Sequence, residues 1–303
     1  MFALDGVQLP LTDAEAKNLL VLAPRLKGHL PLSEAAGTAE EAALVQRLHE
    51  RGAVFDLPIA KESVPTSRFC DYLYTRITWW RTHKTRGEWP WRDVIARGQA
   101  SVGYLQGILI ENYHYVHAAA IRQSPLLSHA ASPAIFDLIR DFVTGEAAHE
   151  SYFLETLTRW GLPASDVQQA TPLTSTAEFI ALQYRLAHQS ILDYLAGSAT
   201  LEVDPGVYER EGDPYQAWEA TYGIDPEVLA PVRQHIRDDV ESGLSQLFRT
   251  AALEMAPAEL PLGTATSALQ SARTVFQATR FWQRNTYEYY QLGGAGNMGR
   301  VSL

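Results

Sequence analysis

The sequence predicts an all-α protein with a small mixed α+β unit at its N-terminus. Apolar residues recur at helical spacing from about residue 70 onward, for example at Leu229, Val232 and Ile236. Proline and glycine separate the helical stretches, as in SP at 132–133 and WGLP at 160–163. After residue 60 no alternating stretch is long enough to predict a sheet. The main part of the chain is therefore expected to be a helical bundle.

Residues 1–58 are expected to form a separate small unit. TDAEAKNLLVLAPRL reads as a helix with Thr12 or Asp13 as its N-cap. A second helix begins after Thr38, carries Leu44, Val45 and Leu48 and ends at Gly52, and AVFDL after it predicts a strand. This order resembles a winged-helix module, and more specifically the small precursor-peptide-recognition domains attached to peptide-modifying enzymes. A plain N-terminal helical extension is the alternative interpretation.

The rest of the chain divides into a linker at 59–66, a helical domain at 67–292 and a loose tail at 293–303. The linker contains Pro65 and has no periodicity, and the tail, GGAGNMGRVSL, is rich in glycine. The candidate helices span 67–85, 91–123, 132–160, 173–200, 214–222, 226–255 and 263–291.

Composition excludes several classes of function. The chain has 303 residues, 46 % of them hydrophobic, which is enough for a packed core, and a formal net charge of −10 argues against nucleic acid as a partner. The apolar runs are too short to span a membrane, and no signal peptide is visible, so we expect a cytoplasmic protein without a membrane partner. Cys70 is the single cysteine, which excludes an intramolecular disulfide framework. A homodimer is left open.

Three helical segments carry residues at spacings that suit a metal ion. In TGEAAHESYF, Glu146 and His149 lie three residues apart, so they are expected to share a helix face. Paired helices with Glu-x-x-His motifs hold carboxylate-bridged di-iron sites in helical bundles. Glu202 ends a long apolar helix just before the loop. In PVRQHIRDDVESGL, His235, Asp239 and Ser242 follow an i, i+4, i+7 ladder.

Each of these segments also has an ordinary interpretation. A Glu-x-x-His pair is common by chance, and Glu202 by itself reads as a solvated helix end. His235 and Asp239 by themselves read as a surface pair worth a few tenths of a kcal/mol. The combination of the three segments is more specific than any one of them.

In order along the chain, the segments resemble the heme-oxygenase-like di-iron oxidases and oxygenases. Glu202 lies 56 residues after Glu146, and His235 lies 33 residues after Glu202. GEAAHESYFLETLTRWGL and HIRDDVESG are similar to two metal-binding segments of that family. The resemblance covers about residues 67–292 and implies a seven-helix fold shared with thiaminase II and pyrroloquinoline-quinone synthase.

The resemblance implies Fe(II), one or two ions, with metal ligands at Glu146, His149, Glu202, His235 and Asp239. Ser242 stands where the family has its last histidine, and a serine hydroxyl is a poor ligand for Fe(II). Three outcomes are open: one intact iron with a weak second site, a replacement ligand from elsewhere, or no metal at all.

A replacement ligand and a substrate pocket have candidates on other helices. Glu111, His114 and His117, or alternatively Glu111 and Tyr115, lie around one helix, although packing is the commoner role of such residues. His188 lies about four turns before Glu202, too far for a ligand but suitable for lining a pocket. Tyr287 or Tyr290 on the last helix is expected to touch substrate, as is Ser242, and Arg280 or Arg284 could pair with an acidic substrate.

The resemblance implies an iron-dependent enzyme that activates O2. Its substrate would be a small amino-acid-like or peptide-linked metabolite in natural-product biosynthesis, and the reaction an N-oxygenation, a desaturation or a C–C cleavage. A metal-free oxidase of the pyrroloquinoline-quinone-synthase type is the first alternative. A non-catalytic peptide-binding partner is the second.

Overall fold

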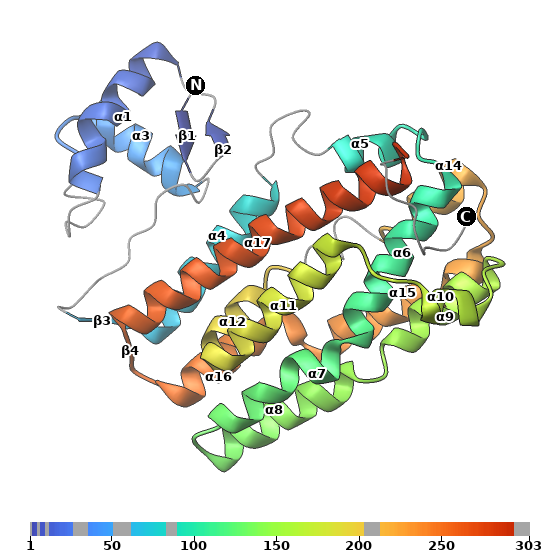
Figure 1. The fold of residues 1–303 in the computed structure, drawn as a ribbon. Coiled ribbons are helices and arrows are strands. Elements are labelled where there is room, and N and C mark those ends of the chain that lie inside the picture. The colour runs from blue at the N-terminus through green and yellow to red at the C-terminus, as the bar shows by residue number, and fades with distance from the viewer. Residues whose placement is uncertain are drawn as a thin grey trace. The chain divides into compact units, whose positions relative to one another are not determined.

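The computed structural model describes residues 2–4, 7–9, 12–26, 36–50, 62–82, 90–202 and 213–293 (Figure 1). The chain divides into two compact units. The first contains Met1–Glu88 and Ala252–Leu269, and the second contains Trp89–Ala251 and Gln270–Leu303. The proposed domain boundaries at residues 58 and 67 stay a prediction.

The first unit begins with a hairpin and two helices. Strands β1 (Phe2–Leu4) and β2 (Val7–Leu9) are antiparallel, and helices α1 (Asp13–Leu26) and α3 (Ala39–Glu50) pack against each other. Both expected caps form: the Glu15 amide donates to the Thr12 hydroxyl at 3.3 Å, and the Glu41 amide to the Thr38 hydroxyl at 3.1 Å.

Helices α1 and α3 bury the apolar residues that their helical periodicity predicts to face inward. Leu44, Val45 and Leu48 of α3 are buried, as are Leu19 and Leu22 of α1. The predicted strand at 53–57 lies outside the described residues. The winged-helix interpretation therefore remains an expectation.

The first unit also contains a second small sheet that the sequence did not predict. Strand β3 (Ser63–Pro65) pairs antiparallel with β4 (Glu259–Pro261), with Val64 opposite Leu260. The expectation that no sheet follows residue 60 was wrong, because strands of three residues are too short to show an alternating pattern. Helix α4 (Thr66–Thr82) begins directly after β3.

The second unit is a helical bundle, as predicted. Its elements are α5 (Pro90–Ala96), α6 (Val102–His117), α7 (Ala119–Gln123), η1 (Ser124–His129), α8 (Pro133–Glu146), α9 (Glu150–Arg159), α10 (Ala164–Gln169), α11 (Thr174–Gln189), α12 (Ile191–Ser198), α14 (Gln216–Tyr222), α15 (Pro226–Ser242) and η2 (Leu244–Gln246). Helices α16 (Leu247–Met255) and α17 (Leu262–Tyr290) each belong partly to this unit and partly to the first.

Helix α9 packs against both α6 and α15, and these three helices position the candidate site. Their shared core contains Leu109 and Tyr113 of α6, Phe153 of α9, and Leu229 and Val232 of α15. The amphipathic pattern of α15 thus buries the face that the periodicity predicted.

Four of the long helices expected from the sequence are interrupted. Ser101 and Ser190 cap new helices, since each side chain accepts a bond from an amide three residues later. Gly243 ends α15 with a left-handed φ of 71°, and residues 147–149 form a turn between α8 and α9. Local capping residues thus divide stretches whose hydrophobic period continues across the break.

Within the described ranges, no helix combines the length and apolar character needed to cross a membrane.

Candidate metal centre

Glu146 and His149 lie at the junction of two helices rather than on one. Glu146 is the last residue of α8, and His149 is the N-cap of α9. The expectation of a shared helix face was therefore wrong in detail. A tight turn nevertheless keeps the two side chains together, because the His149 amide donates to the Glu146 carbonyl at 3.3 Å. Their side chains approach to 3.6 Å, between His149 Nδ1 and Glu146 Oε1.

His235 and Asp239 lie one turn apart on α15. The helix starts with Asp225 as a side-chain cap and Pro226 at its first position, both strong initiation signals. Burial of Leu229, Val232 and Ile236 fixes the rotation of the helix. His235 faces α9, where its ring lies edge-on to Phe153 at 5.1 Å between ring centroids.

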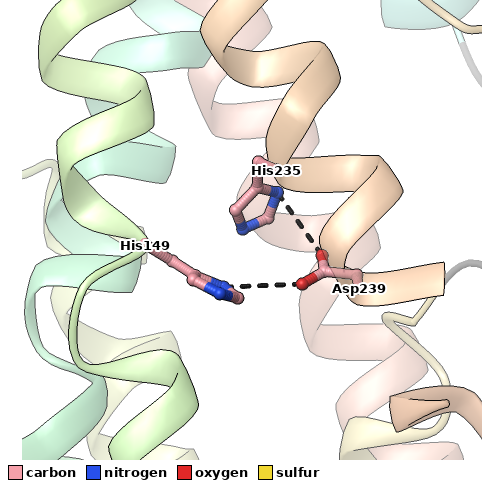
Figure 2. Close-up of side chains that lie close together, drawn as sticks. All are labelled: His149, His235 and Asp239. Atoms are coloured by element: carbon pink, nitrogen blue, oxygen red, sulfur yellow. Dashed lines mark ion pairs between the residues drawn. The ribbon is translucent and has the colours of Figure 1, made fainter. Parts of the chain in front are cut away.

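The structure brings His149, His235 and Asp239 into one cluster (Figure 2). One carboxylate oxygen of Asp239 lies 3.4 Å from His149 Nδ1, and the other lies 3.4 Å from His235 Nδ1. The two imidazole rings are perpendicular, with centroids 4.8 Å apart. One ligand atom from each residue falls within 4.8 Å of the others. Two imidazoles and one carboxylate form the donor set of many non-heme Fe(II) oxygenases.

The buried polar atoms of this cluster fit a metal ion. Nδ1 of His149 and Oδ1 of Asp239 are buried, and neither has a hydrogen-bond partner. Both side chains are 13 % exposed, so bulk water does not satisfy these atoms. Orphaned buried polar atoms are costly in a folded protein, and a bound cation would satisfy both.

Burial and nearby carboxylates set the protonation of the cluster. Burial, together with the negative charges of Glu202, Glu146 and Asp238, raises the pKa of Asp239 to about 9. Burial also raises the pKa of Glu146. Burial and the neighbouring His149 lower the pKa of His235 to about 3. The imidazole of His235 is therefore neutral at physiological pH, as a metal ligand must be.

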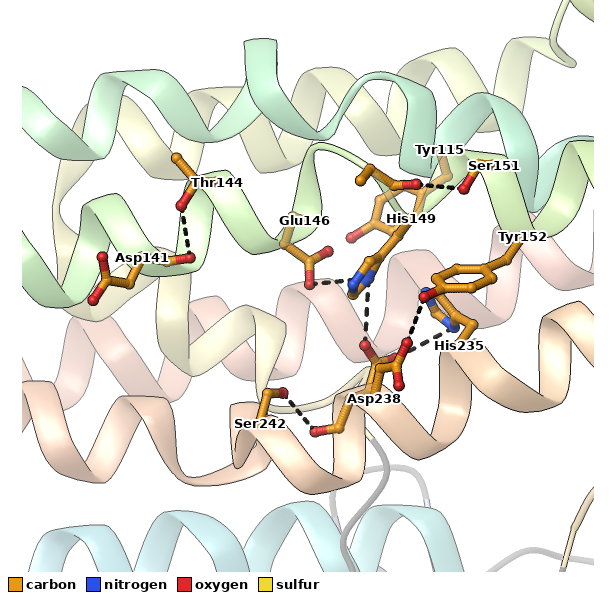
Figure 3. A network of polar contacts seen from close by, with 12 residues as sticks. Tyr115, Asp141, Thr144, Glu146, His149, Ser151, Tyr152, His235, Asp238 and Ser242 are labelled. Atoms are coloured by element: carbon orange, nitrogen blue, oxygen red, sulfur yellow. Dashed lines mark hydrogen bonds and ion pairs between the residues drawn. The ribbon is translucent and has the colours of Figure 1, made fainter.

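A second group of buried residues adjoins the cluster and was not found from the sequence as a group. Tyr115 is partly buried, and Figure 3 shows its phenol pointing to the space between Glu146 and His149. The Arg122 guanidinium stacks on the Tyr115 ring, with Cζ 3.7 Å from the ring centroid. Glu202, which is partly buried, acts electrostatically on Tyr115, Arg122 and Asp239.

The comparisons with known proteins define the fold and not the activity. No protein-family model matches the sequence, and no curated protein matches it significantly. A domain of unknown function from Shewanella denitrificans with a heme oxygenase-like fold matches with a TM-score of 0.63 and 18 % identity, covering 78 % of this chain and 98 % of that one. A TenA homologue from Pseudomonas syringae matches with a TM-score of 0.50 and 9 % identity, covering 74 % and 91 %. The chain has the heme-oxygenase-like fold.

Within this heme-oxygenase-like bundle, Ser242 does not join the cluster. It is exposed at the end of α15, and its hydroxyl donates to the Asp239 carbonyl of its own helix at 2.9 Å. Near it, Tyr152 donates to the Asp238 carboxylate, which also accepts from Gln234 at 2.6 Å (Figure 3). This outer network orients α9 against α15 next to His149 and His235.

The ligand and pocket candidates on α6, which are Glu111, His114 and His117, have different surroundings. Glu111 is buried and accepts bonds from the Leu173 amide, the Thr176 hydroxyl and the Tyr290 hydroxyl. This network ties α6 to α11 and α17. His117 is exposed and pairs with Glu150, whereas His114 is buried edge-on against Tyr113. Pocket roles for these residues stay predictions.

The two remaining pocket candidates lie on α11 and α17. His188 is exposed, with its ring edge-on to Tyr184 at 4.5 Å. Tyr287 is partly buried, with its ring edge-on to Tyr104 at 5.5 Å. Neither belongs to the cluster of His149, His235 and Asp239.

Proposed function

We propose that this protein is an iron-dependent oxidoreductase that activates O2. The observation that supports this most directly is the partly buried cluster of His149, His235 and Asp239, in which two buried polar atoms lack hydrogen-bond partners. Two imidazole nitrogens and one carboxylate oxygen would hold Fe(II), with Glu146 next to them as a further carboxylate. A bound Fe(II) would supply the electrons that activate O2 towards a substrate.

The residues around the cluster would control protons and water. Glu146 has a raised pKa and can hold a proton at Oε1, 3.6 Å from His149 Nδ1. The Tyr115 phenol, whose pKa burial also raises, stays protonated and points to the space between Glu146 and His149. The Phe153 ring packs against His235 and excludes water from that side.

A small amino-acid-like or peptide-linked metabolite is the substrate class we favour. The peptide-linked version depends on the N-terminal unit, whose order resembles precursor-peptide-recognition domains. N-oxygenation, desaturation and C–C cleavage are all compatible with the proposed centre. Cytoplasmic location and a homodimer belong to the same proposal.

Measurements of metal binding in two matched histidine variants test the proposed function. The protein is purified anaerobically and supplied with Fe(II), and iron content and O2 consumption are measured for wild type, His149→Ala and His188→Ala. His149 belongs to the partly buried cluster, whereas His188 is exposed beside Tyr184. We expect His149→Ala to lose iron by at least tenfold and O2 consumption with it, and His188→Ala to keep both.

Two other results would contradict the proposed metal enzyme or the proposed location of the metal. Iron content at background in the wild type would reject the metal enzyme. O2-dependent turnover without metal would then support the metal-free oxidase alternative. Equal loss of iron in both histidine variants would show that the metal binds outside the cluster.

A further inference from the structure

Arg122 of α7 is a buried cation that no carboxylate contacts. Its side chain is 3 % exposed, and a guanidinium remains charged in a protein. Glu146 and Glu202 act on it electrostatically, but within the described part of the chain no carboxylate forms an ion pair with it. A buried charge without a partner is costly, so this position favours an anion that a ligand supplies.

The hydrogen bonds of Arg122 leave one edge of its guanidinium unbonded. Nη1 donates to the Tyr115 carbonyl at 2.9 Å. Nε is buried without a hydrogen-bond partner, and no residue that the structure describes accepts a bond from Nη2. Nε and Nη2 share one edge of the planar group, and their N–H bonds point in the same direction. This edge matches the two oxygens of a carboxylate, which would accept two parallel hydrogen bonds.

Tyr115 connects Arg122 to the metal cluster. Cζ of Arg122 lies 3.7 Å from the centroid of the Tyr115 ring, so the guanidinium covers one face of that ring. The phenol oxygen at the end of the same ring points to the space between Glu146 and His149 (Figure 3). A carboxylate bound to Arg122 would therefore lie about the length of one aromatic ring from the cluster.

Aromatic packing holds Tyr115 in place. Its ring centroid lies 5.2 Å from that of Phe179 and 5.5 Å from that of Trp282. Trp282 is itself fixed, because its Nε1 donates to the Thr176 hydroxyl at 2.9 Å. A guanidinium held on such a ring is ordered before a ligand arrives, which lowers the entropic cost of binding.

We propose that Arg122 binds a carboxylate group of the substrate and so holds the rest of the molecule at the metal cluster. The substrate class narrows to molecules with a free carboxylate, such as an amino acid or the C-terminal residue of a peptide. One guanidinium balances the single charge of a carboxylate, whereas a phosphate group carries about −1.5 to −2 charges at pH 7. The inference rests on the proposed function, because a substrate presupposes the enzyme.

Binding of carboxylic acids and their amides to the metal-free, full-length chain tests this role. Benzoate is compared with benzamide, and octanoate with octanamide, because each amide has nearly the shape of its acid without the charge. Dissociation constants are measured by ligand-observed NMR with a chelator present, so no metal takes part. We expect at least one acid to bind the wild type about tenfold more tightly than its amide, since the amide loses a charge-assisted pair of hydrogen bonds.

Three variants locate the binding site. Arg122→Met removes the guanidinium, so acid and amide should bind equally. Arg122→Lys keeps the charge without the parallel donors, so its preference for the acid should be smaller than that of the wild type. Arg140→Met is the matched control and should keep the full preference, because Arg140 is an exposed arginine paired with Asp137 and Asp141.

Several outcomes would overturn the proposal. These are equal binding of acid and amide by the wild type, and an unchanged preference for the acid in a folded Arg122→Met. If Arg122→Met does not fold, an unchanged preference in Arg122→Lys has the same meaning. Displacement of the acid by an equal concentration of inorganic phosphate would assign the site to inorganic anions and would also overturn the proposal.

The failure of this inference is distinguishable from the failure of the proposed function, because the binding measurement needs no metal. Preference for the acid in a protein that takes up no iron would reject the metal enzyme and leave the carboxylate site at Arg122. Iron uptake without that preference would leave the metal enzyme standing and overturn the role of Arg122.

Discussion

Asp239 couples the stability of the metal-free protein to pH. Its pKa is raised to about 9 in the folded state from its usual value of 3.8, so the folded protein holds a proton that the unfolded chain has lost. Stability from this group therefore falls as pH rises. His235, with its pKa lowered to about 3 from 6.5, opposes this trend below pH 6.5 only. The net loss of folding stability is therefore expected between pH 6.5 and pH 9.

We predict that the metal-free wild type loses stability between pH 6.5 and 9 and that Asp239→Asn loses much less. Asparagine cannot release a proton, so the linkage disappears. Urea unfolding in the presence of a chelator measures the free energy of unfolding at both pH values. Asp141→Asn is the control, since Asp141 is 69 % exposed and pairs with Arg140. Equal pH slopes in wild type and Asp239→Asn would contradict the assignment.

At the scale of residues, the sequence predicted the cluster better than its surroundings. His149, His235 and Asp239 were recognisable because helix spacing and distances along the chain follow a recurring pattern. Their role as ligands stays a prediction. Arg122, which stacks on the Tyr115 ring, carries no such signal in the sequence. Ser242 was placed on the right helix but is directed at its own backbone.

The packing of α6 against α17 leaves no room for a side chain at Gly107. A Cβ there would overlap the Tyr290 ring, whose hydroxyl donates to buried Glu111 at 2.9 Å. Gly145 near the end of α8 is the opposite case, since a Cβ there would meet nothing within 4 Å. Alanine substitutions at these two glycines therefore distinguish the effect of helix propensity on stability from the effect of close packing.

We predict that Gly107→Ala lowers the free energy of unfolding by about 1–3 kcal/mol, because the Tyr290 ring must move and its bond to Glu111 is disturbed. Gly145→Ala should raise it by about 0.5–1 kcal/mol, since alanine restricts the unfolded chain and favours the helix. Chemical denaturation of both variants makes the measurement. Stabilisation by Gly107→Ala would show that α17 does not pack closely on α6.

At the scale of elements, the sequence predicted where helical segments lie but not where they are interrupted. The last helix was expected at 263–291 and is found at Leu262–Tyr290, because its apolar pattern is long and has strong ends. The stretch 173–200 splits at Ser190, whose side chain caps α12 while the hydrophobic period continues. A capping residue can end a helix even where the apolar period continues, and a single sequence does not show which of the two signals determines the helix boundary.

At the scale of the whole molecule, the heme-oxygenase-like fold was predictable from motif order, although identity to the solved structures is only 18 % and 9 %. The small sheets were not predictable, since strands of three residues are too short to show an alternating pattern and β3 pairs with a strand far along the chain.

A bound metal ion should make the junction of α8 and α9 unfold together with α15. His149 comes from that junction, and His235 and Asp239 of α15 lie 86 and 90 residues later in the sequence (Figure 2). Because the unfolded chain does not bring these residues together, a metal ion stabilises only the folded state. At a free concentration 100 times Kd, this linkage contributes about 2.7 kcal/mol.

We therefore predict that saturating Co(II) raises the Tm of the wild type by roughly 5 °C, given about 2 °C per kcal/mol for a chain of this size. Thermal unfolding with Co(II) and with a chelator measures the difference. His149→Ala and Asp239→Asn should show a much smaller shift, because each lacks one donor of the cluster, whereas His188→Ala should match the wild type. An equal shift in all four proteins would mean that the ion binds at the surface rather than between these helices.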